Sequence, residues 1–210
     1  MHGMARGNDL QNLDKEDMDL GGGGAVILPD RARGPVPHLV LACGKSGMLY
    51  VLDRDRLGHY NSSSNSQIVQ SFMLDKNWIY TTPLFWQDTL YEVGNMGPVK
   101  AFRILAETGQ FQTTPFSASS QSYAYPGATP VVSAAGTKDA ILWVIDPATP
   151  GVLHAYDPLN LSTEFWNSSQ AANQRDQAGA GLKFTVPTVA NGKVYIGTQT
   201  ELDVYGLLPN

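Results

Sequence analysis

The chain has 210 residues, of which 42% are hydrophobic and 16% charged, and its formal net charge is -5. This length is sufficient for a core without a disulfide or metal, and the composition excludes a disordered chain, a coiled coil and a basic nucleic-acid-binding protein. The 21 glycines and 13 prolines are spread along the whole sequence. Turns are therefore frequent, which favours an all-β fold.

The beginning of the chain differs from the rest. Residues 1–20 form a polar, acidic N-terminal segment without the apolar stretch of a signal peptide or anchor. Residues 21–210 are expected to form one domain, and no segment reaches the roughly 18 apolar residues of a membrane-spanning helix. The single cysteine, Cys43, excludes an internal disulfide and a cysteine zinc cluster.

Four copies of one strand pattern follow one another along the chain. Each begins with a short apolar strand after a small residue or proline, and its second strand is rich in Val, Ile, Leu, Tyr and Trp. A third strand follows in every copy, and three copies have a fourth, more polar strand. The strands expected in the first two copies are 24–28, 38–42, 48–53 and 67–74, then 82–86, 89–93, 99–103 and 110–116. Those expected in the last two copies are 129–133, 140–145, 152–157 and 162–167, then 186–190, 193–197 and 202–206.

The spacing of the copies indicates the architecture. The corresponding positions Asp53, Arg103, Asp157 and Gly206 are 50, 54 and 49 residues apart. This period is typical of four-stranded propeller blades with their loops. The fourth copy shows only three strands. Two segments outside the pattern, 58–66 and 171–180, are expected to be loops because they are polar or contain glycine.

The amino-acid sequence of the repeats resembles that of a known family. The segments 186–198 (VPTVANGKVYIGT) and 151–157 (GVLHAYD) are similar to the PQQ-like repeat of quinoprotein-type β-propellers. The resemblance extends over about residues 20 to 208. It implies an all-β propeller of about four blades, and it favours a bacterial, periplasmic or secreted protein.

Rings of this family usually have seven or eight blades, so four blades are half of an eight-bladed ring. Three arrangements remain open: a homodimer in which two halves close a ring, a compact four-bladed ring, and a piece of a longer propeller. In the first arrangement the acidic N-terminal segment could supply the missing outer strand of the last blade. Self-association or binding of another protein is thus the expected partnership, and a nucleic acid is not.

Ligands of propellers usually enter where the loops leading into the first strands open. Four aromatic residues in these loops, Trp78, Tyr80, Tyr123 and Tyr125, could stack a planar or sugar-like ligand. Arg175, beside Asp176, could hold an anionic oxygen. The alternative is that the aromatic rings pack between blades and that Arg175 pairs with Asp176.

A weaker hypothesis concerns a metal. Asp17 and Asp19 lie in an acidic stretch whose carboxylates could bind calcium, although the stretch lacks the glycine and the distant glutamate of an EF-hand loop. A solvated acidic linker is the alternative interpretation.

The enzyme chemistry of the family is not recognisable here. The resemblance implies calcium ligands, a catalytic aspartate and, in alcohol-oxidising members, adjacent cysteines, and no residue can be matched to these roles. The catalytic residues are therefore unknown, and PQQ and calcium are possible cofactors only. We expect a non-enzymatic binding or scaffold module. The alternatives are a PQQ-dependent dehydrogenase that is active as an assembled ring, and a hydrolase that uses carboxylates.

Overall fold

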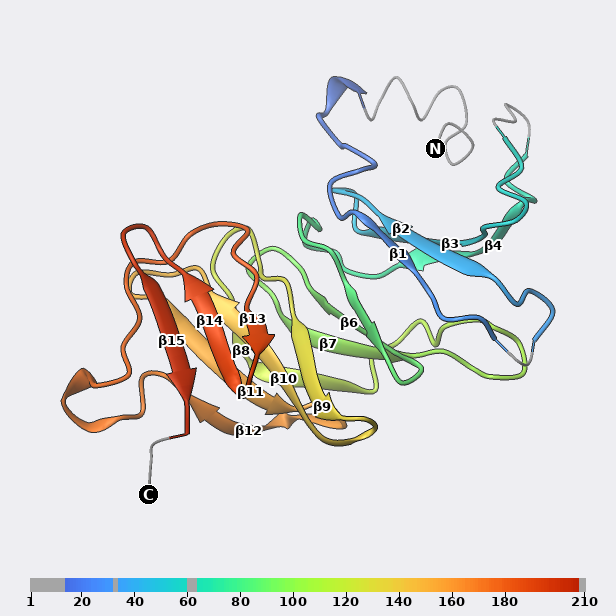
Figure 1. The fold of residues 1–210 in the computed structure, drawn as a ribbon. Coiled ribbons are helices and arrows are strands. Elements are labelled where there is room, and N and C mark those ends of the chain that lie inside the picture. The colour runs from blue at the N-terminus through green and yellow to red at the C-terminus, as the bar shows by residue number, and fades with distance from the viewer. Residues whose placement is uncertain (1–13, 32–33, 60–63, 208–210) are drawn as a thin grey trace.

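The computed structural model describes residues 14–31, 34–59 and 64–207, and they form four antiparallel sheets (Figure 1). The first blade contains β1 Ala25–Ile27, β2 Leu39–Cys43, β3 Met48–Asp53 and β4 Ile68–Met73. The second contains β5 Leu84–Trp86, β6 Thr89–Val93, β7 Pro98–Arg103 and β8 Ser117–Ser122. The third contains β9 Val131–Ala135, β10 Lys138–Asp146, β11 Val152–Asp157 and β12 Asn160–Asn167. The fourth contains β13 Thr188–Ala190, β14 Lys193–Gly197 and β15 Leu202–Gly206.

The strands of each sheet follow one another in space in the order in which they occur in the chain. This up-and-down order is that of propeller blades, and the all-β, propeller-like fold with four blades is confirmed. In Figure 1 the blades succeed one another from β1–β4 at one end to β13–β15 at the other. No helix among the described residues is long and apolar enough to cross a membrane.

One expected strand is wrong. The fourth strand of the second blade was expected at 110–116, but it is β8, Ser117–Ser122. In the expected range, Phe111 forms an isolated bridge with Ile104 and buries its ring between the first two blades. Phe111 therefore fills a core, and the actual strand consists only of Ser, Ala and Gln.

The two expected loops have different outcomes. The range 171–180 contains a single 3-10 turn, Ala172–Gln174, and is otherwise irregular. The range 58–66 has no strand in its described part, but residues 60–63 lie outside the described residues. The same holds for residues 1–13 of the acidic segment, whereas residues 14–20 lie against the turn between β2 and β3, where Lys45 N donates to Asp19 O at 3.0 Å.

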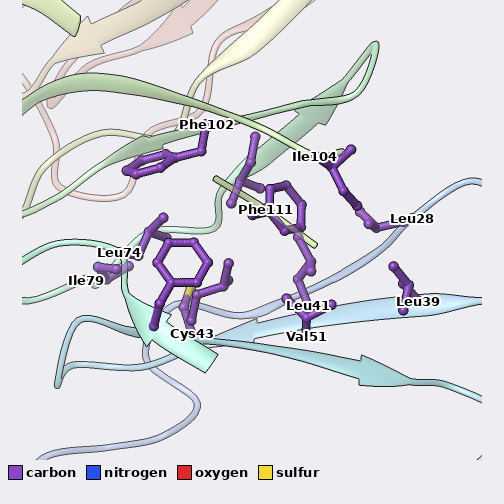
Figure 2. Packing of buried hydrophobic residues seen from close by; sticks show 13 residues of the cluster. Leu28, Leu39, Leu41, Cys43, Val51, Leu74, Ile79, Phe102, Ile104 and Phe111 are labelled. Atoms are coloured by element: carbon purple, nitrogen blue, oxygen red, sulfur yellow. The ribbon is translucent and has the colours of Figure 1, made fainter. Parts of the chain in front are cut away.

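Three apolar cores join the blades in pairs. The core between the first and second blades contains Leu41 and Val51 of the first blade and Leu90 and Phe102 of the second. Figure 2 shows Phe111 between Val51 and Phe102. The rings of Phe72 and Phe102 pack with their centroids 6.1 Å apart. A second core joins the second and third blades, and a third joins the third and fourth. Alternate residues of each inner strand enter the cores on opposite sides, because side chains of a strand alternate between its two faces.

The outer faces of the two end blades do not share such a core. Among the described residues, every cluster that spans two blades joins neighbours in the chain, and none joins the fourth blade to the first. The described chain is thus an open series of blades.

The core between the first two blades provides a test of the packing. Phe102 is 1% exposed, and we expect Phe102→Ala to lower the free energy of unfolding by about 3–5 kcal/mol, because it removes transfer energy and leaves a cavity. The matched control is Phe165→Ala, since Phe165 is 53% exposed, with an expected change within about 0.5 kcal/mol. Urea denaturation measures both values, and equal effects of the two changes would contradict this packing.

Candidate functional site

The candidate site lies at one end of the strands, which we call the loop face. It consists of the turns between the second and third strands of the blades and the longer segments that lead into the first strands. In the first blade, β1 begins opposite the end of β2, with Ala25 paired to Ala42. Because the strands are antiparallel, the segment leading into β1 and the turn after β2 meet at this end. The same register holds for the other blades.

Three aromatic rings lie in a row on the loop face. Trp78 and Tyr80 contact each other edge to face with centroids 6.2 Å apart, and Tyr80 contacts Tyr125 in the same way at 5.6 Å. Lys183 extends the row, with its Nζ atom 4.5 Å from the centroid of the Tyr125 ring. Segments leading into the second, third and fourth blades thus contribute to one array. We call these four residues the aromatic row.

The row is fixed by its neighbours in sequence. Ile79, between Trp78 and Tyr80, is fully buried in the first core, so the two rings beside it are held at the surface. The Trp78 carbonyl accepts a hydrogen bond of 2.9 Å from the amide of Asn95 in the turn after β6. Trp78 and Tyr125 remain 49% and 45% exposed. The row therefore offers aromatic surface to a ligand from a supported position.

Asp17 and Asp19 lie near the row, but their carboxylates are engaged. Lys45 Nζ lies 2.9 Å from Asp17 Oδ2 and 2.6 Å from Asp19 Oδ2, and the hydrogen bonds that it donates to Asp19 and then Asp17 raise the pKa of Lys45. Both carboxylates are thus bound to an ammonium group, and a calcium site at this acidic stretch stays a prediction. The described residues also contain no group of three or more His, Cys, Asp and Glu that could hold a metal.

Arg175 and Asp176 form a bidentate pair with each other. Arg175 Nε and Nη2 donate to the two Asp176 carboxylate oxygens at 2.6 and 2.7 Å, and these hydrogen bonds lower the pKa of Asp176. Tyr205 donates to the Asp176 carbonyl at 3.1 Å, which places the pair beside the fourth blade. The guanidinium edge proposed for an anionic oxygen is thus already bound to a carboxylate.

Tyr123 does not lie in the aromatic row. It is 1% exposed in the core between the second and third blades, where its hydroxyl donates to Tyr156 Oη at 2.9 Å. The ring also contacts His154 edge to face, and His154 Nδ1 lies 2.6 Å from Glu164 Oε1. Tyr123 directly follows β8, and its amide donates to the Gly97 carbonyl at 3.0 Å, so its ring enters the core. It is unavailable to a ligand on the loop face.

A buried charge cluster supports the loop face, and the sequence analysis missed it. Lys100 forms an ion pair with Asp75, which is 3% exposed, and Asp75 Oδ1 accepts a hydrogen bond of 2.8 Å from the Asn77 amide. Glu92 stands opposite Lys100 in the register of β6 and β7 and is 1% exposed. Neither of its carboxylate oxygens has a hydrogen-bond partner. Burial, and then the charge of Asp75, raise the pKa of Glu92 well above its usual range.

A signal for this cluster is present in the sequence. Glu92 is the one charged residue of β6, and it stands opposite Lys100 in the register of the hairpin. A carboxylate inside an apolar strand indicates a buried partner across the sheet, because an unpaired buried charge is costly. Lys183, by contrast, lies in a loop without any pattern that singles it out.

The fold and the exposed aromatic row define a propeller-like protein with a candidate binding face. No protein-family model matches the chain, and no curated protein matches it. Among solved structures, the computationally designed Ika8 protein is similar, with a TM-score of 0.52 and 12% identity over 80% of this chain and 43% of that one. At this identity the likeness shows the fold alone.

Two further structures show weaker likeness. BamB from Moraxella catarrhalis has a TM-score of 0.47 and 15% identity, covering 82% of this chain and 44% of that one. BBS1N, from a complex with ARL6DN, has a TM-score of 0.41 and 12% identity, covering 88% of this chain and 52% of that one. Both are β-propeller proteins. The chain described here spans about half the length of each of the three structures, or less.

The buried Glu92 predicts a pH dependence. Because its pKa is raised in the folded protein, the folded state binds more protons than the unfolded state above the usual glutamic acid pKa of 4.5. The contribution of protonated Glu92 to the free energy of unfolding is therefore fully present below pH 4.5. It is lost as the pH rises from there towards the pKa of Glu92 in the folded protein. We expect Glu92→Gln to remove this loss, so that its stability advantage over the unmodified protein grows with pH.

Urea unfolding at several pH values between 4 and 9 measures the effect. The control is Glu16→Gln, because Glu16 is exposed and its replacement should leave the pH profile unchanged. A constant difference between Glu92→Gln and the unmodified protein over this range would show that Glu92 is not a source of the pH dependence.

Proposed function

We propose that the chain is a non-enzymatic binding or scaffold module that takes a ligand with a flat ring on the loop face. The ligand class is an aromatic heterocycle or a sugar ring, because both present a face that stacks on Trp and Tyr side chains. Lys183, at the end of the aromatic row, would favour a ligand with an anionic or hydroxyl oxygen at one edge.

The observation that carries the proposal is the continuity of the row. Trp78 contacts Tyr80, which in turn contacts Tyr125, and the three rings come from two different loops. Trp78 and Tyr125 keep about half of their surface exposed to water. Exposed aromatic surface held in a fixed geometry loses little conformational entropy on binding. The anchoring of the row by Ile79 supplies this condition.

Two alternatives lack a comparable observation. A PQQ-dependent dehydrogenase and a carboxylate-dependent hydrolase both need polar groups that converge on a substrate, and the carboxylates of Asp17, Asp19 and Asp176 are each bound to a basic side chain. We therefore propose neither as the function. A periplasmic or secreted location stays a prediction from the resemblance of the repeats.

Saturation-transfer NMR with a panel of aromatic heterocycles, including PQQ, and of oligosaccharides tests the proposal. We expect at least one of these probes to bind, and the double change Trp78→Ala and Tyr125→Ala to weaken that binding at least tenfold, because it removes the two most exposed rings of the row. The stability of the double variant should stay close to that of the unmodified protein, since both rings are about half exposed.

The matched control is Phe165→Ala, which removes a ring of 53% exposure outside the row. It should leave the binding of every probe unchanged. The proposal fails if none of the probes binds at millimolar concentration, or if the double variant binds them as well as the unmodified protein does.

A further inference from the structure

The fourth blade lacks the outer strand that the other three blades have. In those blades β4, β8 and β12 pair antiparallel with β3, β7 and β11, which are the third strands of their sheets. The third strand of the fourth blade, β15, pairs with β14 on one side and has no strand on its other side among the described residues. Figure 1 shows β15 at the outer margin of the last sheet. One edge of β15 is therefore open.

The backbone groups on this open edge follow from the register of the last hairpin. The Thr198 amide donates to the Glu201 carbonyl at 2.9 Å, so this pair closes the hairpin of β14 and β15. Directly opposed residues of antiparallel strands alternate between hydrogen-bonded and non-hydrogen-bonded pairs. Leu202, Val204 and Gly206 therefore point their N–H and C=O groups away from β14.

The third blade uses the same backbone groups to hold its outer strand. Leu153 of β11 stands in the register position of Leu202. Its carbonyl accepts a hydrogen bond of 2.9 Å from the amide of Ser168, directly after β12. Leu153 is 0% exposed, whereas Leu202 is 64% exposed and Val204 is 48% exposed. The edge that is covered in the third blade thus faces water in the fourth.

The open edge carries none of the common features that prevent strands from pairing. Exposed edge strands are often protected by lysine, by proline or by a β-bulge. The sequence of β15 is LDVYG, and its register with β14 is regular. Its one charged residue, Asp203, accepts a hydrogen bond of 3.2 Å from the Gly179 amide of its own chain. β15 therefore offers a regular and unprotected edge to another strand.

We propose that β15 pairs antiparallel with β15 of a second copy of this chain, across a two-fold axis beside Val204. In this register Val204 stands opposite Val204 of the second copy, and Leu202 stands opposite Gly206 of the second copy. Each such pair exchanges two hydrogen bonds, so the outward N–H and C=O groups of all three residues find partners. Addition of a strand to an open sheet edge is a common mode of protein recognition. The contact is isologous, so it closes as a dimer.

The side chains of β15 favour this register. Paired residues of antiparallel strands share one face of the sheet, so Val204 meets its own copy, and Leu202 lies beside a glycine that leaves room for it. On the other face, Asp203 stands opposite Tyr205 of the second copy. A register centred on Leu202 would instead place Glu201 opposite Asp203, and two carboxylates directly opposite each other repel. The sequence of β15 thus complements itself about Val204.

The proposed dimer joins two fourth blades edge to edge in one continuous sheet. Because the paired strands are short, we expect an association that depends on protein concentration. The contact involves only the edge of β15 and does not depend on what the loop face binds. It also does not close a ring, so a homodimer of two half-rings stays a prediction from the resemblance of the repeats.

Light scattering of the purified chain over a range of concentrations tests the proposal. We expect the mass to rise from the 22.7 kDa of one chain towards twice that value as the concentration approaches the millimolar range. Val204→Lys should keep the mass at that of one chain, because two ammonium groups meet at the two-fold axis. An equimolar mixture of Val204→Lys with Val204→Glu should dimerise again, since opposite charges then face each other.

The matched control is Val186→Lys. Val186 is 46% exposed, close to the 48% of Val204, but it precedes β13 and lies outside β15. This variant should dimerise like the unmodified protein. Circular dichroism confirms that each variant is folded.

A disulfide experiment locates the two-fold axis. Val204→Cys should form a covalent dimer on mild oxidation, because the Cα atoms of a hydrogen-bonded pair are about 5.5 Å apart, within reach of a disulfide. Leu202→Cys should not, since its two copies would lie about 14 Å apart along strands that rise about 3.4 Å per residue. The native Cys43 is buried and does not compete.

Four results overturn the proposal. The first is a mass of one chain at every concentration, whatever the loop face binds. The second is a dimer that survives Val204→Lys, and the third is a mixture of the two charged Val204 variants that stays monomeric. The fourth is a disulfide that forms as readily in Leu202→Cys as in Val204→Cys.

Discussion

The structure depends on the packing of sheets face to face. A sheet of three or four short strands with apolar residues on both faces cannot be stable alone in water, because either face would expose a large apolar area. Here the facing sides of neighbouring sheets cover each other, so the blades stabilise one another in series. This constraint also fixes the loops, since the segments between blades must span from the outer strand of one sheet to the inner strand of the next.

The packing of the blades also holds the loop face in place. The segment that carries Trp78 and Tyr80 is held from below by Ile79 in the core and by Asp75, which is paired with Lys100 of the second blade. Gly47 allows the first blade to approach the same segment, since its φ is 79° and a side chain there would overlap the Asp75 carbonyl. The aromatic row is therefore supported by the core and is not an independent surface feature.

The sequence predicted the blades well because each inner strand is apolar on both faces and is bounded by turns. The outer strands were harder: β8 is polar and has no alternation of apolar and polar residues, so no pattern marked its position after 110–116. The site was only partly predictable. Tyr123 and Tyr125 are two residues apart in one loop, yet only the second reaches the surface, because the backbone at Tyr123 is bonded to Gly97 of the neighbouring turn. Such a contact between distant segments is not visible in local sequence patterns.

The three cores differ in size, and this has a consequence for local opening. In the part of the chain that the structure describes, thirteen buried residues join the first two blades, ten join the second and third, and four join the third and fourth. In a series of units that touch only their neighbours, the unit with the weakest junction opens first. The backbone amides of β13–β15 in a single chain should therefore exchange with solvent hydrogen at a lower opening free energy than those of β5–β7, and the middle of the molecule should be its slowest-exchanging part.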